Sequence, residues 1–176
     1  MLQSRSSSTG SDLPVAARGR ATWLGRVWVA VCGGVVVDVG FGPDPPYALQ
    51  DDVTATKVAR NVADFLEGAV QRVEAPLFWD AMPPVHAEMM RVLYENVPWG
   101  HVVSYGELAV LAGYPGAARA AGTACRHCPF FPIVPCHRVI AAHGRLGGFL
   151  GRPDVKRRLL EAEGLGPFPI HTPDIR

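Results

Sequence analysis

Residues 103–128 read VSYGELAVLAGYPGAARAAGTACRHC, and this stretch decides the fold of the second half of the chain. Ser104 lies three residues before Glu107, which is the spacing of a capping box and predicts that a helix begins here. Glycines and a proline in residues 113–116 predict a turn, and the small residues of 117–128 predict a second helix. Helix, short turn and helix is the plan of a helix-turn-helix.

The second predicted helix carries mostly small side chains. Ala118, Ala120 and Gly122 leave few side chains that could read base edges, and Arg119 stands among them as a long cation. A smooth helix can press close to a groove while one cation reaches into the base stack, which favours sequence-independent DNA binding over promoter recognition. A helical hairpin without any DNA role is the alternative.

Upstream, the sequence predicts a small N-terminal α/β domain over residues 20–83. Residues 1–19 are Ser-rich and predict a flexible tail. The Val- and Trp-rich segment 21–41 predicts two strands joined by a Gly-Gly hairpin turn. Apolar residues at helical spacing predict a helix over 54–73.

Prolines at positions 76, 83 and 84 predict a linker and a domain boundary near residue 83. Beyond it we expect a C-terminal domain over 84–176, which begins with a helix over 85–96 and contains the predicted helix-turn-helix. The fold class is therefore α/β (α+β): a small α/β domain followed by a mainly helical domain with a helix-turn-helix, winged-helix-like in plan.

Charge is distributed unevenly along the chain, although the formal net charge is only +1. No acidic residue occurs between Glu107 and Asp154, and five arginines fall in that window of 46 residues: Arg119, Arg126, Arg138, Arg145 and Arg152. Such a window predicts a local positive surface suited to a polyanion such as DNA.

Composition places the protein among ordinary globular chains. Of its 176 residues 48% are hydrophobic, and the apolar stretch 27–39 is shorter than the roughly 18 residues that a membrane span needs. The N-terminus has no apolar core typical of a secretory signal. We therefore expect a cytoplasmic protein (nuclear in a eukaryote) whose four cysteines are thiols or ligands rather than disulfides.

The strongest candidate for chemistry is Cys136, in the pentad Pro-Cys-His-Arg-Val of residues 135–139. The apolar run before it predicts that Cys136 ends a buried strand, with His137 beside it. Burial alone raises the pKa of a thiol, whereas a neighbouring base or cation favours the nucleophilic thiolate. A nucleophile fits this pattern, and a core cysteine is the alternative.

Residues 84–164 closely resemble the active-site domain of the O6-alkylguanine-DNA alkyltransferases. The matching segments occur in the family's order and spacing, and they are residues 102–109, 117–122, 133–140, 146–149 and 156–164, the last beginning at Lys156. The resemblance implies DNA repair by direct reversal of damage. A flipped O6-alkylguanine would lose its alkyl group irreversibly to a cysteine, and each protein molecule would act once.

The resemblance also implies the roles of five residues. Cys136 would attack the alkyl carbon, His137 would favour the thiolate through a water, and Glu163 would orient His137. Tyr105 would donate a proton or hydrogen bond to the guanine ring. Arg119 would fill the place that the flipped base leaves in the stack.

Further residues would hold the DNA and the base. The expected base pocket uses backbone groups of Cys136, Val139 and Leu150, with Phe149 at its rim and Tyr105 beside the ring. The expected DNA contacts besides Arg119 are Ser104, Ala118, Ala120 and Gly122. Double-stranded DNA containing O6-alkylguanine is the expected partner. We expect a monomer that needs no cofactor and has no membrane partner.

The sequence departs from the family at Cys128, where an asparagine usually precedes the proline that ends the second helix. A thiol cannot replace the donors and acceptors of an amide, so the reaction rate or the rigidity of the nucleophile loop is in question. Cys125 and Cys128 form a Cys-x-x-Cys that could be a redox pair or half a zinc site, although ligation would consume Cys136. We expect no bound metal.

Four functions compete on this evidence. The first is the suicide alkyltransferase. The second is an alkyltransferase-like protein that binds and flips the lesion, lacks the nucleophile and recruits another repair pathway; Cys136 argues against it. A cysteine hydrolase would need an oxyanion hole that nothing in the sequence requires. A transcription factor would need more base-reading side chains than this helix offers.

Overall fold

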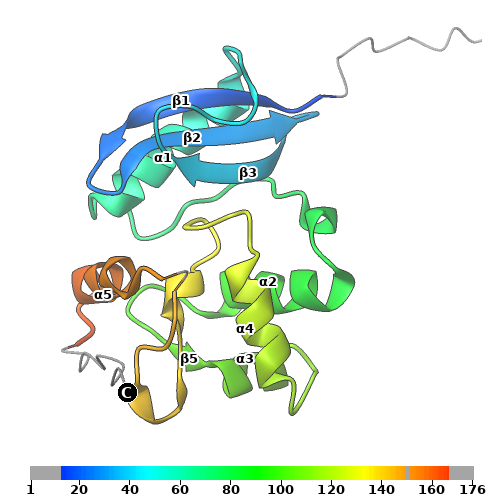
Figure 1. The fold of residues 1–176 in the computed structure, drawn as a ribbon, viewed down its shortest axis with the longest axis vertical. Helices are drawn as coiled ribbons and strands as arrows, with labels where there is room; N and C mark the ends of the chain where they lie inside the picture. Colours follow the sequence, from blue (N-terminus) through cyan, green and yellow to red (C-terminus); the bar gives the residue numbers. More distant parts are fainter. Residues whose placement is uncertain (1–12, 150, 167–176) are drawn as a thin grey trace, which may run out of the picture.

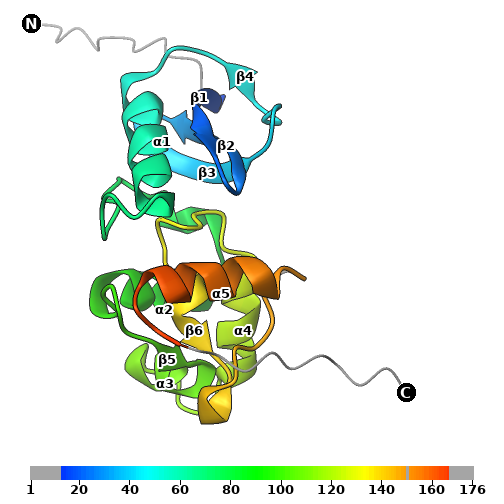
Figure 2. The same cartoon turned by 90° about the vertical axis from the view of Figure 1, so that its left-hand side faces the viewer.

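The computed structural model describes residues 13–149 and 151–166. A sheet with one helix lies above a group of helices, and the segment that carries the pentad rises between them (Figure 1). The turned view places α1 against the sheet and α5 along the flank of the lower part (Figure 2). The fold is mixed α/β, as expected from the sequence.

The upper sheet has the strand order β3-β2-β1-β4. Antiparallel pairs join β1 (Val15–Thr22) to β2 (Gly25–Cys32) and β2 to β3 (Val35–Phe41), while the short β4 (Ala48–Leu49) runs parallel to β1. The two strands expected over 21–41 are confirmed as β2 and β3, joined by the turn at Gly33 and Gly34, and β1 is an additional strand that lies mostly before that region. The first strand also begins inside the segment expected to be a tail, since its Ala, Gly and Arg residues have weak strand propensity and hide the pattern.

Helix α1 (Val53–Leu66) packs against β1 and β2. Asp52 caps its first turn by accepting a hydrogen bond from the Ala55 N–H at 2.8 Å. The expected helix over 54–73 is too long, because Gly68 adopts a φ of 77° just past the end and reverses the chain. Residues 67–73 instead lead back toward the lower helices.

The lower part contains the predicted helix-turn-helix. A 3₁₀ turn η1 (Trp79–Ala81) precedes α2 (Pro84–Asn96), and α3 (Tyr105–Leu111) packs against α4 (Ala118–Arg126). The capping box is present: the Ser104 hydroxyl accepts from the Glu107 N–H at 3.1 Å, and the Glu107 carboxylate accepts from the Ser104 N–H at 2.7 Å. The spacing alone predicted this cap correctly. Helix α5 (Pro153–Ala162) closes the described part.

The segment before Cys136 is not a strand, contrary to the expectation from its apolar run. Residues 129–134 form successive turns, and Cys136 begins the 3₁₀ turn η2 (Cys136–Arg138). Pro132 and Pro135 lack the N–H that a strand would need, so the run buries without joining a sheet. Only after η2 does the chain form β6 (Val139–Ile140), which pairs in parallel with β5 (Val103–Ser104). A further 3₁₀ turn, η3 (Ala142–Gly144), follows.

One apolar core runs through both parts. The Val39 N–H on β3 donates to the Pro129 carbonyl at 2.9 Å, and the Phe65 ring of α1 contacts the rings of Trp99 and His137 at 5.6 and 5.9 Å. The upper sheet and α1 therefore support the turns that carry Cys136 from behind. None of the helices among the described residues has the length and apolarity to cross a membrane.

Candidate active site and DNA-binding face

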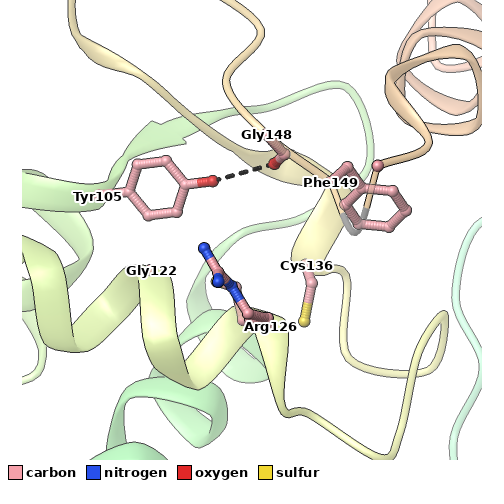
Figure 3. A pocket seen from close by; sticks show the side chains of 8 residues that line it. Tyr105, Gly122, Arg126, Cys136, Gly148 and Phe149 are labelled. Carbon is pink, nitrogen blue, oxygen red and sulfur yellow. Dashed lines mark hydrogen bonds between the residues drawn. The ribbon is translucent and has the colours of Figure 1, made fainter.

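A pocket of about 660 Å³ opens between α3, α4 and the segment before α5 (Figure 3). Its walls combine two thiols, a phenol, a guanidinium and a phenyl ring with three glycines. The lining residues are Tyr105, Gly122, Cys125, Arg126, Cys136, Gly148, Phe149 and Gly151. The structure thus brings Cys136, Tyr105, Gly122 and Phe149, all expected from the sequence, into one cavity. It adds Cys125 and Arg126, which sequence reasoning did not assign to the site.

Cys136 lies at the inner wall of this pocket and is 2% exposed. Its thiol lies 3.7 Å from the Met90 sulfur and interacts with the thiols of Cys125 and Cys128. These two thiols, and then burial, raise the pKa of Cys136 well above its ordinary value. The resting nucleophile is therefore a protonated thiol that needs a base.

His137 and Glu163 meet although 26 residues separate them. His137 Nε2 lies 2.7 Å from Glu163 Oε1, and both side chains are buried. Arg138 donates from Nε to both Glu163 oxygens at 3.1 and 3.0 Å, and the Gly100 N–H donates to Oε2 at 3.0 Å. Arg138 is also anchored by a 2.7 Å hydrogen bond to the Val97 carbonyl. Sequence reasoning missed Arg138 as part of this network.

The network fixes the tautomer of His137. Burial opposes ionisation of Glu163, but His137 and Arg138 outweigh it and hold the pKa of this carboxyl below its ordinary value. A carboxylate only accepts hydrogen bonds, so His137 Nε2 must donate. Burial lowers the pKa of His137 despite Glu163, so the ring is neutral and its Nδ1 is an acceptor. This Nδ1 is buried without a hydrogen-bond partner in the described part of the chain.

Tyr105 opens α3 and points its hydroxyl into the pocket, toward the Gly148 carbonyl at 3.4 Å (Figure 3). Burial, followed by the nearby charges of Cys125 and Cys136, raises the pKa of Tyr105 to about 12. The phenol therefore keeps its proton at neutral pH. Arg126 extends from the last turn of α4 into the space between Tyr105 and Cys136.

Lys156 on α5 is fully buried beside the site. Its ammonium donates to the Val139 carbonyl at 2.6 Å and lies 5.8 Å from the Tyr105 ring and 6.0 Å from the Phe149 ring. Burial lowers the pKa of Lys156 to about 8, although the charges of Cys125 and Cys136 partly offset this. On the sequence, Lys156 marked only the start of a matching segment. Its role in fixing the Val139 carbonyl depends on tertiary structure.

The rim of the pocket is apolar. Phe149 packs edge-on against Phe131 with ring centroids 5.1 Å apart. A Cβ built on Gly122 would lie 3.9 Å from the Tyr105 ring, in ordinary van der Waals contact, so the backbone of this glycine passes close to the Tyr105 ring in the pocket wall. Leu150, expected to hold the base through its backbone, lies outside the described residues.

The outer face of α4 carries the expected DNA contacts. Arg119 is exposed and extends from the helix, with the partly buried Ala118 and Ala120 beside it. The five-arginine window is less uniform than expected, because Arg138 is buried on Glu163 and Arg152 pairs with Asp154 at 3.1 Å. Arg119, Arg126 and Arg145 remain as exposed cations of that window. Across residues 13–149 and 151–166, no group of three or more His, Cys, Asp or Glu side chains is arranged to hold a metal ion.

Comparisons with known proteins agree with this geometry. A family model described as the DNA-binding domain of 6-O-methylguanine DNA methyltransferase matches residues 84–165. A Thermus thermophilus protein named "DNA base-flipping protein" is 38% identical over 149 residues, covering 81% of this chain and 96% of that protein. A Mycobacterium tuberculosis protein named "Methylated-DNA--protein-cysteine methyltransferase" is 55% identical over 68 residues, which are 39% of this chain and 41% of that protein.

The fold of the whole described chain is also similar to a solved structure. The crystal structure of Mycobacterium tuberculosis OGT in complex with DNA superposes with a TM-score of 0.71 at 30% identity, covering 85% of this chain and 92% of that one. The similarity thus extends through the upper sheet as well as the helix-turn-helix. On this evidence the chain belongs to the O6-alkylguanine-DNA alkyltransferase family of DNA repair proteins.

Proposed function

We propose that this protein removes alkyl groups from O6-alkylguanine in double-stranded DNA by transferring them irreversibly to Cys136. The observation that carries the proposal is the placement of this thiol. Cys136 lines a cavity together with a proton-holding phenol, and the next residue, His137, is a neutral imidazole oriented by a buried carboxylate. A nucleophile, a base and an orienting group are the parts that covalent catalysis requires.

The proposed reaction is a single displacement. The Cys136 sulfur attacks the alkyl carbon as the bond from that carbon to O6 breaks. The thiol proton leaves through a bridging water to Nδ1 of His137, the acceptor that the Glu163 contact leaves open. Tyr105 supplies a proton or hydrogen bond to the departing guanine, and its raised pKa keeps that proton available. The products are a thioether and an unmodified guanine.

Each protein molecule reacts once because the thioether formed at Cys136 is stable. A thioether carries a much poorer leaving group than an O6-alkylated guanine, so neither water nor a neighbouring thiol removes the alkyl group from Cys136. Each protein molecule therefore repairs one lesion. The expected stoichiometry is one alkyl group per chain.

Access to the lesion requires the nucleotide to leave the duplex, because O6 is buried in the base stack. The exposed Arg119 on α4 would occupy the vacated position. Ala118, Ala120 and Gly122 let the helix approach the groove, and the Ser104 cap lies at the start of α3. Arg126 and Arg145 add positive charge for the phosphates.

A second function, lesion binding without alkyl transfer, has one specific observation in its favour. The Thermus thermophilus relative is named a base-flipping protein rather than a methyltransferase, and its similarity covers most of this chain. The thiol at position 128 would be the place where the reaction was lost, because it holds the pKa of Cys136 up.

Intact mass spectrometry separates the two functions. The protein is mixed with a duplex carrying one O6-methylguanine, and Cys136→Ala serves as the matched control. A gain of one methylene per chain, mapped by peptide sequencing to Cys136 and absent in the control, supports alkyl transfer. Lesion-selective binding by both proteins without any mass gain supports the binding function instead.

A further inference from the structure

Three of the four cysteines gather around the pocket, although the family pattern accounts for only one of them. Cys125 sits in the last turns of α4, Cys128 follows that helix, and Cys136 begins η2. Cys136 interacts with the thiols of both Cys125 and Cys128, and all three cysteines are free. The cluster forms only in the folded chain, since the bend between Cys128 and Cys136 returns the nucleophile to α4.

Cys125 is better placed than Cys128 to react with Cys136. It lines the same cavity as Cys136 and is half-buried, whereas Cys128 does not line that cavity. A small solute that enters the pocket reaches both sulfurs. Two thiols that line one cavity and interact with each other can approach the roughly 2.05 Å of a disulfide by side-chain rotation.

Cations lie beside the cluster. Lys156 interacts electrostatically with both Cys125 and Cys136, and Arg126 lines the same cavity. These cations attract the negative charge that appears once a proton has left one of the thiols. A thiolate beside a second thiol is the arrangement in which peroxide oxidation ends in a disulfide.

We propose that Cys125 and Cys136 form a reversible disulfide when hydrogen peroxide enters the pocket, which makes this site a redox modification site as well as an alkyl acceptor. One thiolate attacks the peroxide, giving a sulfenic acid and, after protonation, one water. The second thiol then displaces a second water and forms the sulfur–sulfur bond. Both cysteines are oxidised together by two electrons, and the peroxide is reduced to two waters.

The disulfide has two consequences. It removes the lone pair that attacks the alkyl carbon, so repair stops until a dithiol reductant restores the thiols. It also shields Cys136 from sulfinic and sulfonic oxidation, which would destroy the site permanently. The disulfide itself is detected without DNA, so its formation can fail or succeed independently of the proposed alkyl transfer, and only the loss of alkyl acceptance rests on that function.

The experiment treats the full-length reduced protein with hydrogen peroxide, blocks remaining thiols with iodoacetamide and analyses tryptic peptides without reduction. Cleavage after Arg119, Arg126 and Arg138 puts Cys125 on peptide 120–126, while Cys128 and Cys136 share peptide 127–138. A Cys128→Ser variant makes a link between these peptides specific for Cys125 and Cys136. Cys125→Ser is the matched variant that removes the proposed partner.

The expected result is a linked pair of peptides in the wild type and in Cys128→Ser that disappears on treatment with dithiothreitol. Cys125→Ser should give no such link and should accumulate sulfinic acid at Cys136. Alkyl acceptance from a methylated duplex should fall in proportion to the linked fraction and recover on reduction. A link that persists in Cys136→Ala, a loop within peptide 127–138, or no link in Cys128→Ser would each overturn the assignment.

Discussion

Replacing Glu163 with glutamine keeps the shape of this side chain but removes the charge on which three donors converge. Oε1 accepts from His137 and Arg138, and Oε2 accepts from Gly100 and Arg138. The amide NH₂ of glutamine replaces one of these two oxygens, and at either position this NH₂, which only donates hydrogen bonds, meets two other donors. The Arg138 guanidinium, only 6% exposed, is left without its counter-charge. Removing one partner of a buried pair costs about 3–5 kcal/mol of unfolding free energy.

Urea unfolding of the wild type and of Glu163→Gln measures this cost, with Arg138→Met and the double variant completing a cycle. Arg138→Met alone should also destabilise, but the double variant should lose less than the sum, because neither charge is then left uncompensated. The coupling energy should be about 1–3 kcal/mol. A loss below about 1 kcal/mol in Glu163→Gln, or strict additivity, would refute the interpretation of Glu163 as a buried carboxylate serving both His137 and Arg138.

Three further predictions concern the other groups of the site. Lys156→Met should remove a pH dependence of the unfolding free energy that the wild type shows. The pKa of Lys156 is about 8 in the folded chain and 10.5 in the unfolded chain, so between these values the unfolded chain binds the extra proton and the wild type gains about 3 kcal/mol of stability relative to the variant as the pH rises from 8 to 10.5. Parallel pH profiles of the two proteins in urea unfolding would contradict this. Tyr105→Phe should slow single-turnover alkyl transfer by about 10- to 100-fold, because it removes one hydrogen bond to the negative charge that develops on the departing guanine. The melting temperature should not change. An unchanged rate would exclude Tyr105 as the donor. Arg119→Ala should slow repair of lesions in a duplex by about 10- to 100-fold. The rate of reaction with the free base O6-benzylguanine and the stability of the protein should not change. An equal fall in the rate with the free base would show that Arg119 does more than hold the duplex open.

Local patterns in the sequence predicted local structure well. The capping box at Ser104 and Glu107 is confirmed because both partners lie within one helical turn, where spacing alone sets the geometry. The helix-turn-helix is confirmed for the same reason. The helix expected over 54–73 was predicted too long. The helical spacing of apolar residues continues in the sequence after Leu66, but Gly68 adopts a positive φ and the helix ends before it.

Apolar content misled the prediction for the segment before Cys136. A run such as residues 130–134 is typical of a buried strand, but burial and strand pairing are separate properties. Here the prolines prevent pairing, and the run packs as turns against the upper sheet. The nucleophile consequently begins a 3₁₀ turn, which sets Cys136 into the pocket wall and leaves His137 facing the interior.

The sequence by itself determined the family, the helix-turn-helix and the identity of the thiol, because these depend on residue types at short spacings. Tertiary structure alone decided which distant groups meet. Glu163 reaches His137 across 26 residues, Arg138 is a buried counter-ion of Glu163 instead of part of the expected positive surface, and Cys136 lies beside the thiols of Cys125 and Cys128. The physical reason is that burial, and the charge and proton state that follow from it, depend on everything packed around a side chain, not on its neighbours along the chain.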